Sequence, residues 1–104
     1  MIVTLPSKRD IGVARAQAVS WTGDGTAATI KLGFNPNMVT IVNETDTVVY
    51  EKIATQVAAN CLKIIAAGTT TVDTGSLVVL PLDGTVVLAA AANLAGKVFH
   101  LFAE

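Results

Sequence analysis

Branched side chains dominate this sequence and restrict what it can fold into. Val, Ile and Thr together account for 34 of the 104 residues. A second heavy atom on Cβ limits side-chain rotation in a helix, but it packs well on the pleated surface of a sheet. The surplus therefore predicts a fold made mostly of β-strands.

Turn-forming residues divide the chain into short apolar runs. Clusters of Gly, Asn, Asp and Pro occur at 23–25, 35–37, 43–46, 73–75 and 83–84, and such clusters favour turns between strands. This spacing is typical of an all-β sandwich or small barrel. We expect about seven to eight strands, with ends uncertain by a few residues, at 13–21, 26–32, 38–43, 47–53, 61–66, 76–81, 85–91 and 96–103.

The segment from Met38 to Ile53 is the clearest local unit. Val39 and Ile41 alternate with Thr40, and the turn at 43–46 leads into a second apolar run. This pattern predicts a β-hairpin.

Two segments favour a helix by local criteria. Apolar residues recur at helical spacing from Ile53 to Ile64, so a helical turn near 54–60 is an alternative there. The alanine run 89–92 also has high helix propensity. Because that run directly continues an apolar strand pattern, we expect it to extend the strand at 85–91.

The composition fits one folded domain that binds no polyanion. A chain of 104 residues with 52% hydrophobic and 14% charged residues can bury a single core. Its formal net charge of −1 leaves no excess of cations for phosphate groups. We therefore expect neither nucleic acid nor a membrane as a partner.

The first ten residues differ from the rest and predict an extended arm, 1–10, before a single β domain, 11–104. The arm has an apolar tip, then Pro6, which interrupts regular pairing, and then three charged residues. The tip is either a first edge strand or a segment that docks on a partner, and we favour docking. The N-terminus lacks the pattern of a secretory signal, so we expect synthesis in the cytoplasm.

Residues suited to catalysis are scarce. The chain has one His, His100, and one Cys, Cys61, whereas nucleophilic catalysis needs a nucleophile, a base and an orienting group. We expect His100 to be a hydrogen-bonded core or interface residue and Cys61 to be a small buried side chain. A lone cysteine excludes an internal disulfide. We predict no enzyme activity, no catalytic residue, no cofactor and no metal.

The acidic residues of the turns have a structural explanation. Asp24, Asp46, Asp73 and Asp83 lie in turn clusters, where carboxylates accept hydrogen bonds from nearby backbone groups. The segment 23–28 loosely matches a dinucleotide-binding pattern, but it has no room for the helix which that pattern requires. We expect it to be the tip of a hairpin.

Large aromatic side chains are few, and three of them lie outside the last predicted strand. They are Trp21, Phe34 and Tyr50. Each is either a core residue or an anchor of a protein interface, which large amphipathic side chains often provide.

Two segments carry a family resemblance. Residues Gly33 to Asp46 read Gly-Phe-Asn-Pro-Asn-Met-Val-Thr-Ile-Val-Asn-Glu-Thr-Asp, and Val49-Tyr50-Glu51 follows. This resembles a recurrent pattern of small virion proteins of tailed bacteriophages, with a Gly-Phe-x-Pro turn, a strand, an Asn-x-Thr-Asp turn and a return strand. The segment 93–100 is similar to the last strand of the same proteins, which are head decoration, or cement, proteins.

The resemblance implies a function that consists of binding and includes no catalysed reaction. It implies a homo-oligomeric structural protein, made in the bacterial cytoplasm, that binds the exterior of a phage capsid and stabilises it, with the major capsid protein as partner. The expected capsid contacts are then the arm residues Ile2, Val3, Leu5, Lys8 and Arg9. The expected anchors of the oligomer interface are Trp21, Phe34 and Tyr50.

Two other functions stay open at this point. Another virion part, such as a tail-tube, tail-tip or fibre-base domain, would have the same β-rich, charge-poor composition. A small ligand-binding barrel is the second alternative, and it would need polar residues that converge in a pocket.

Overall fold

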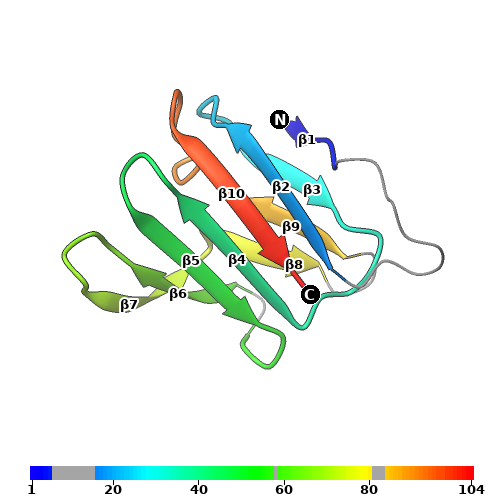
Figure 1. Cartoon of the computed structure of the whole chain (residues 1–104). Helices are drawn as coiled ribbons and strands as arrows, with labels where there is room; N and C mark the ends of the chain where they lie inside the picture. The colour runs from blue at the N-terminus through cyan, green and yellow to red at the C-terminus, as the bar shows by residue number, and fades with distance from the viewer. Residues whose placement is uncertain (6–15, 58, 81–83) are drawn as a thin grey trace.

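The structure, a computed structural model, describes residues 1–5, 16–57, 59–80 and 84–104 (Figure 1). These residues form two packed β-sheets and contain no helix, so the prediction of an all-β sandwich is confirmed. Instead of seven to eight strands there are ten. They are β1 (Ile2–Val3), β2 (Gln17–Thr22), β3 (Ala28–Lys31), β4 (Met38–Asn43), β5 (Val48–Ile53), β6 (Asn60–Ile64), β7 (Thr70–Thr74), β8 (Leu77–Leu80), β9 (Thr85–Leu88) and β10 (Val98–Ala103).

The two sheets differ in size. One has four strands in the order β1-β3-β9-β8, and the other has six in the order β2-β10-β4-β5-β6-β7. Only the short β1–β3 pair is parallel among the described strands. In Figure 1 the β6–β7 pair lies at one side, beyond the main overlap of the two sheets.

The predicted hairpin is present as β4 and β5. Their register pairs Met38 with Ile53 at the open end and Asn43 with Val48 at the turn. The Asn43 side chain closes the turn, because its Oδ1 accepts the Asp46 N–H at 3.0 Å and its Nδ2 donates to Asp46 Oδ2 at 3.1 Å. Alternation of apolar residues therefore predicted both the strands and their pairing.

The two segments with helical features behave differently. Residues 54–57 form a turn and bend, with Gln56 N–H donating to the Ile53 carbonyl at 2.9 Å, so the alternative of a helix is not found there. The expected extension of the strand at 85–91 was wrong, because β9 ends at Leu88. Its partner β3 begins opposite, at Ala28, and beyond that point Ala92 and Asn93 both donate to the Ala89 carbonyl. Where the ladder ends, the alanine run follows its helical propensity for a single turn.

The 23–25 cluster connects the two sheets, so the expected hairpin tip was also wrong. It leads from β2 in the larger sheet to β3 in the smaller one. Gly23 N–H donates to the Lys97 carbonyl at 2.8 Å, and a Cβ at Gly23 would overlap the carbonyl of Leu94. Only glycine fits this close approach of two backbones.

The apolar tip of the N-terminus belongs to a sheet of its own chain. Ile2 pairs with Thr29 and Val3 with Ile30, so these two residues form the first edge strand rather than a free arm. Val3 is 6% exposed, whereas Ile2 is 80% exposed. The expected arm boundary at residue 10 lies outside the described residues.

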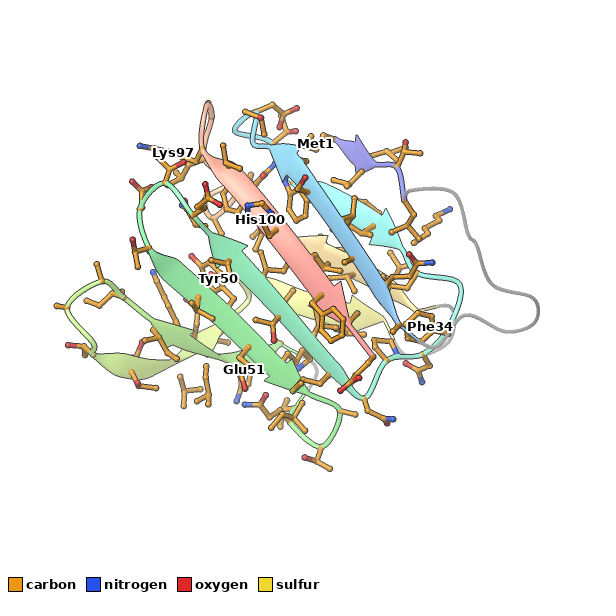
Figure 2. The ribbon with its side chains drawn as sticks, viewed as in Figure 1. Met1, Phe34, Tyr50, Glu51, Lys97 and His100 are labelled. Atoms are coloured by element: carbon orange, nitrogen blue, oxygen red, sulfur yellow. The ribbon has the colours of Figure 1, made fainter. Side chains whose placement is uncertain are left out.

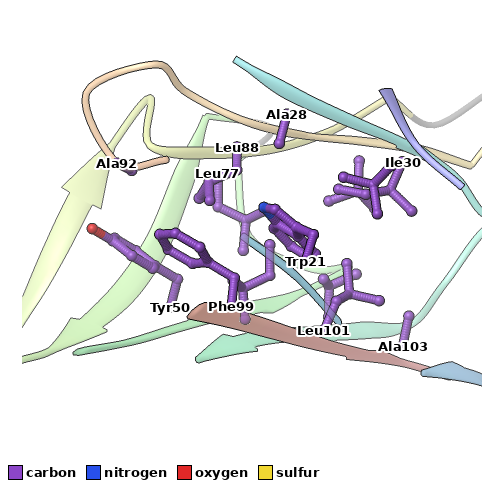
Figure 3. Packing of buried hydrophobic residues seen from close by; sticks show 14 of the residues in the cluster. Trp21, Ala28, Ile30, Tyr50, Leu77, Leu88, Ala92, Phe99, Leu101 and Ala103 are labelled. Atoms are coloured by element: carbon purple, nitrogen blue, oxygen red, sulfur yellow. The ribbon is translucent and has the colours of Figure 1, made fainter. Parts of the chain in front are cut away.

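The core lies between the sheets and is built mainly from aliphatic side chains (Figure 3). Trp21 stacks on Phe99 with ring centroids 5.6 Å apart and an angle of 12° between the planes. Each large side chain buried in this way stabilises the fold by about 1.5 to 3 kcal/mol. The largest fully buried apolar residues are Phe99, Ile30, Leu32, Ile41, Leu77, Leu88, Leu101, Val39 and Val86.

Candidate interaction surface

The larger sheet has one face on the core and one face open to solvent. Strand pairing aligns the side chains of this outer face in two rows that run across all six strands. The first row is Ala18, Phe102, Thr40, Glu51, Leu62 and Val72, and the second is Ser20, His100, Val42, Val49, Ile64 and Thr70. We call these two rows the outer face.

The outer face has a large apolar content for a surface that no described residue covers. Phe102 is 43% and Val72 is 63% exposed, while Val42, Val49 and Leu62 are half-buried. Only Glu51 and His100 among the twelve residues of the rows carry titratable side chains. Exposed apolar surface of this kind is a feature of interaction sites, such as those for proteins.

His100 lies on the outer face and is exposed, so the core alternative was wrong, while its other expected place, in an interface, stays a prediction (Figure 2). The alternation of β10 turns it away from Phe99 and Leu101, which are buried. Its Nε2 lies 2.8 Å from Glu44 Oε1 in the β4–β5 turn. Beside it, Lys97 Nζ lies 3.2 Å from Asp46 Oδ1. These two contacts link the start of β10 to the hairpin.

The other turn carboxylates behave as expected. Asp24 Oδ1 accepts hydrogen bonds from the backbone N–H and the hydroxyl of Thr26, and these bonds lower the pKa of Asp24. Asp73 Oδ1 accepts the Ser76 N–H at 3.0 Å. Asp83 lies outside the described residues.

Trp21 is 9% exposed and belongs to the core. Its indole Nε1 donates to Asn93 Oδ1 at 2.9 Å, and Asn93 Nδ2 donates to the Thr26 carbonyl at 2.8 Å. Asn93 has no exposed surface. Its side chain provides the buried indole N–H with an acceptor and also holds the 23–26 connection in place. The role of Asn93 could not be predicted from the sequence, because nothing in the pattern around it distinguishes a buried amide from a turn residue.

Tyr50 is also a core residue, at 5% exposed, and Phe34 is half-buried against the core. Lys63 Nζ lies 5.7 Å from the centre of the Tyr50 ring. Burial, together with the negative charge of Asp73, raises the pKa of Tyr50. For Trp21 and Tyr50 the structure thus shows the core alternative within one chain, and the proposed interface role of the three aromatics stays a prediction.

Cys61 is fully buried, as expected. Burial and then the Asp73 charge raise the pKa of its thiol above the ordinary value. This arrangement keeps the thiol protonated and unreactive near neutral pH.

Lys52 is the second buried polar residue that the sequence analysis missed. It is 4% exposed, and its ammonium donates to the carbonyls of Val57 and Asn60 at 2.8 Å each. Burial lowers its pKa. Lys52 also lines a cavity of about 260 Å³ together with Pro36, Gln56 and Val79. Through these two carbonyl contacts Lys52 stabilises the connection between β5 and β6.

A second, shallower hollow of about 520 Å³ lies along β2 and β10, where Thr4, Ser20 and His100 line it. Within the described ranges, no three His, Cys, Asp or Glu side chains gather closely enough to hold a metal ion. These ranges also contain no helix long and apolar enough to cross a membrane.

The expected capsid contacts differ in how far they are exposed. Ile2 is exposed, Leu5 is half-buried and Val3 is buried against its own sheet. Lys8 and Arg9 lie outside the described residues.

Comparisons with family models, with curated proteins and with solved structures found no match to this chain.

Proposed function

We propose that this chain is a structural virion protein that binds the outer surface of a tailed-phage capsid and stabilises the lattice. In this proposal it acts by binding alone, on the capsid exterior, with the major capsid protein as its partner. A protein that binds only the mature lattice stabilises that state by mass action, and many copies add avidity.

One structural observation supports the proposal. The two segments that carry the resemblance to decoration proteins are far apart in the sequence but adjacent in the larger sheet. Strand β10 follows the segment 93–97 and pairs directly with β4, which pairs with β5. The resemblance therefore falls on one continuous three-stranded unit, whose outer face carries exposed apolar side chains such as Phe102.

The exposed tip of β1 is the part of the expected contact that has surface to bury. Ile2 is 80% exposed beside Val3, which already packs on the core. Burial of such a side chain against a partner contributes up to about 1.5 to 3 kcal/mol. The substitution Ile2→Ser removes this contribution while the backbone pairing of β1 stays available.

The test uses heads that lack decoration, from the phage whose genome encodes the chain. The wild-type protein should co-sediment with these heads, and Ile2→Ser should bind about tenfold more weakly or worse. Ile53→Ser is the matched control, because Ile53 is also exposed, at 44%, but lies outside the expected contact. Equal binding by wild type and Ile2→Ser would remove Ile2 from the contact.

Location on the particle separates decoration from the other virion functions. Electron cryomicroscopy of complete particles should show density for this protein on the outer surface of the head. Density on the tail, with none on the head, would replace the proposal with a tail-tube, tail-tip or fibre-base role.

A further inference from the structure

The outer edge of the larger sheet differs from the edges at β8 and β2. Strand β7 is the last strand on its side, and no described strand lies beyond it (Figure 1). Four of its five residues are exposed. By contrast, β8 contacts β6, and Thr4 lies beside β2 where both line a hollow.

The backbone of β7 has a definite orientation. Gly75 N–H donates to the Ala59 carbonyl at 2.7 Å, and Ile65 N–H donates to the Thr69 carbonyl at 3.2 Å. Hydrogen-bonded pairs alternate along an antiparallel ladder, so Thr71 and Asp73 turn their backbone groups toward β6. The N–H and C=O groups of the other three residues, Thr70, Val72 and Thr74, then point away from the sheet.

Natural edge strands usually carry features that prevent pairing with another chain, such as Lys, Pro or a bulge. β7 reads Thr-Thr-Val-Asp-Thr and has neither Lys nor Pro, and its register with β6 runs without a bulge from Asn60 to Ile64. Its threonines and its valine have high β-propensity. The edge therefore offers a regular ladder to a further strand, with Asp73 as its one charged residue.

We propose that a second copy of this chain pairs with β7 in antiparallel orientation, with a two-fold axis at Val72. The two six-stranded sheets then form one continuous sheet through an isologous interface. In this register Val72 faces Val72 of the second copy, and Thr70 faces Thr74 on either side. These are the residues whose backbone groups point outward, so all three pairs exchange their hydrogen bonds.

The side chains on both faces of the sheet favour this register. On the outer face it joins Leu62 and Val72 of one copy to the same two residues of the other, which extends an apolar row across the junction. On the inner face it sets Thr71 opposite Asp73 of the second copy, so that a hydroxyl donates to a carboxylate. A slip of two residues toward the strand end would instead oppose Asp73 with Asp73, and like charges directly opposite are destabilising.

Sedimentation equilibrium of the isolated chain tests the dimer. An interface of one short strand is smaller than a standard one, so the protein is examined from about 1 µM to 1 mM. We expect a change from monomer to dimer within that range. A wild-type chain that stays monomeric throughout would overturn the proposal.

Variants at Val72 test where the dimer forms. Val72→Pro removes an N–H that points outward, so it should weaken the dimer more than about tenfold while the monomer keeps its circular dichroism. Val72→Lys places two cations opposite each other and should do the same, which keeps the test valid should the proline variant misfold. Val72→Thr is the matched control and should still dimerise. Folded Pro and Lys variants that dimerise as the wild type does would overturn the proposal.

Amide hydrogen exchange tests the register. The amides of Thr70, Val72 and Thr74 should exchange fast in dilute protein and slowly in the dimer, whereas those of Thr71 and Asp73 should be slow in both. A dimer that leaves the first three amides unprotected would show that another surface pairs. These measurements need no capsid, so they stand or fall independently of the proposed capsid binding.

Discussion

The larger sheet contains two regions that differ in what their side chains do. Where β10 lies at the overlap of the sheets, Phe99 is fully buried and Leu101 is 2% exposed. At the far end, β7 has no buried residue, and Val72 is 63% exposed. The same sheet thus builds a core near one end, from large apolar side chains, and only a ladder at the other, from small β-branched ones. Stability should be concentrated in the first region, and the second has surface free for a partner.

Removal of the central aromatic should show the largest effect. Phe99→Ala leaves a cavity beneath Trp21, because the two rings stack, and should lower the free energy of unfolding by about 3 to 5 kcal/mol. Phe102→Ala, on the same strand but on the outer face, should cost about 1 kcal/mol or less. Urea unfolding followed by tryptophan fluorescence measures both. Equal costs would show that the overlap of the sheets does not concentrate stability.

The buried amide of Asn93 should show the next largest effect. Asn93→Ala leaves the Trp21 Nε1 donor and the Thr26 carbonyl without their side-chain partner, and should cost about 1 to 3 kcal/mol. Trp21→Phe removes the donor but keeps an aromatic ring for the stack. In a double-mutant cycle the two substitutions should therefore be less than additive. Additive costs would contradict a working hydrogen bond between them.

Alkaline pH should affect stability through two buried groups on the inner side of β5 and β6, which lie between the two regions of the sheet. Burial raises the pKa of the Cys61 thiol above its ordinary 9.0 and that of Tyr50 above 10.0. An acid with a raised folded pKa contributes stability that is present below its unfolded pKa and is lost as pH rises through the folded value. The contribution of these two groups to stability should therefore be lost from about pH 9 upward, while the lowered pKa of Lys52 acts in the opposite direction.

The variant Cys61→Ala isolates the thiol. The variant has no thiol to ionise, so it lacks the loss of stability that begins near the thiol pKa of the wild type. The difference between the urea midpoints of wild type and variant should therefore narrow as pH rises from about 7 to 10. A gap that stays constant over this range would contradict the raised pKa of Cys61.

The contact between Glu44 in the β4–β5 turn and His100 should show the smallest effect. Glu44→Gln removes the charge beside His100 Nε2, and both side chains are exposed. Because solvent screens such pairs, the cost should be at most about 1 kcal/mol and should shrink in high salt. Thermal unfolding in low and high salt measures this cost. A larger cost that does not depend on salt would show that solvent does not screen the contact.

The surplus of β-branched residues and the spacing of turn clusters were enough to predict the class of fold, and the alternation of apolar residues predicted the β4–β5 hairpin. It could not predict β7, because Thr70 to Thr74 bury no face and so carry no period-two signal. The contacts of Asn93 with Trp21 and Thr26 were also out of reach, since they depend on which distant segments meet in space. Those of Lys52 are local, but a lysine in an alternating strand gives no sign that its ammonium turns back to the carbonyls of the next connection. The apolar neighbours of His100 left a core place open as one of two alternatives, although the pleat turns its side chain outward.

The position of β10 has a consequence for how the chain is made. This strand, Val98–Ala103, lies between β2 and β4, and those two strands do not pair with each other. Until residues 98–103 leave the ribosome, the larger sheet exists as two separate parts with the core between them open. Folding therefore waits for the last strand, and its rate is set by contacts that span most of the sequence, such as Trp21 with Phe99. Chains with such distant pairings fold in milliseconds to seconds rather than microseconds.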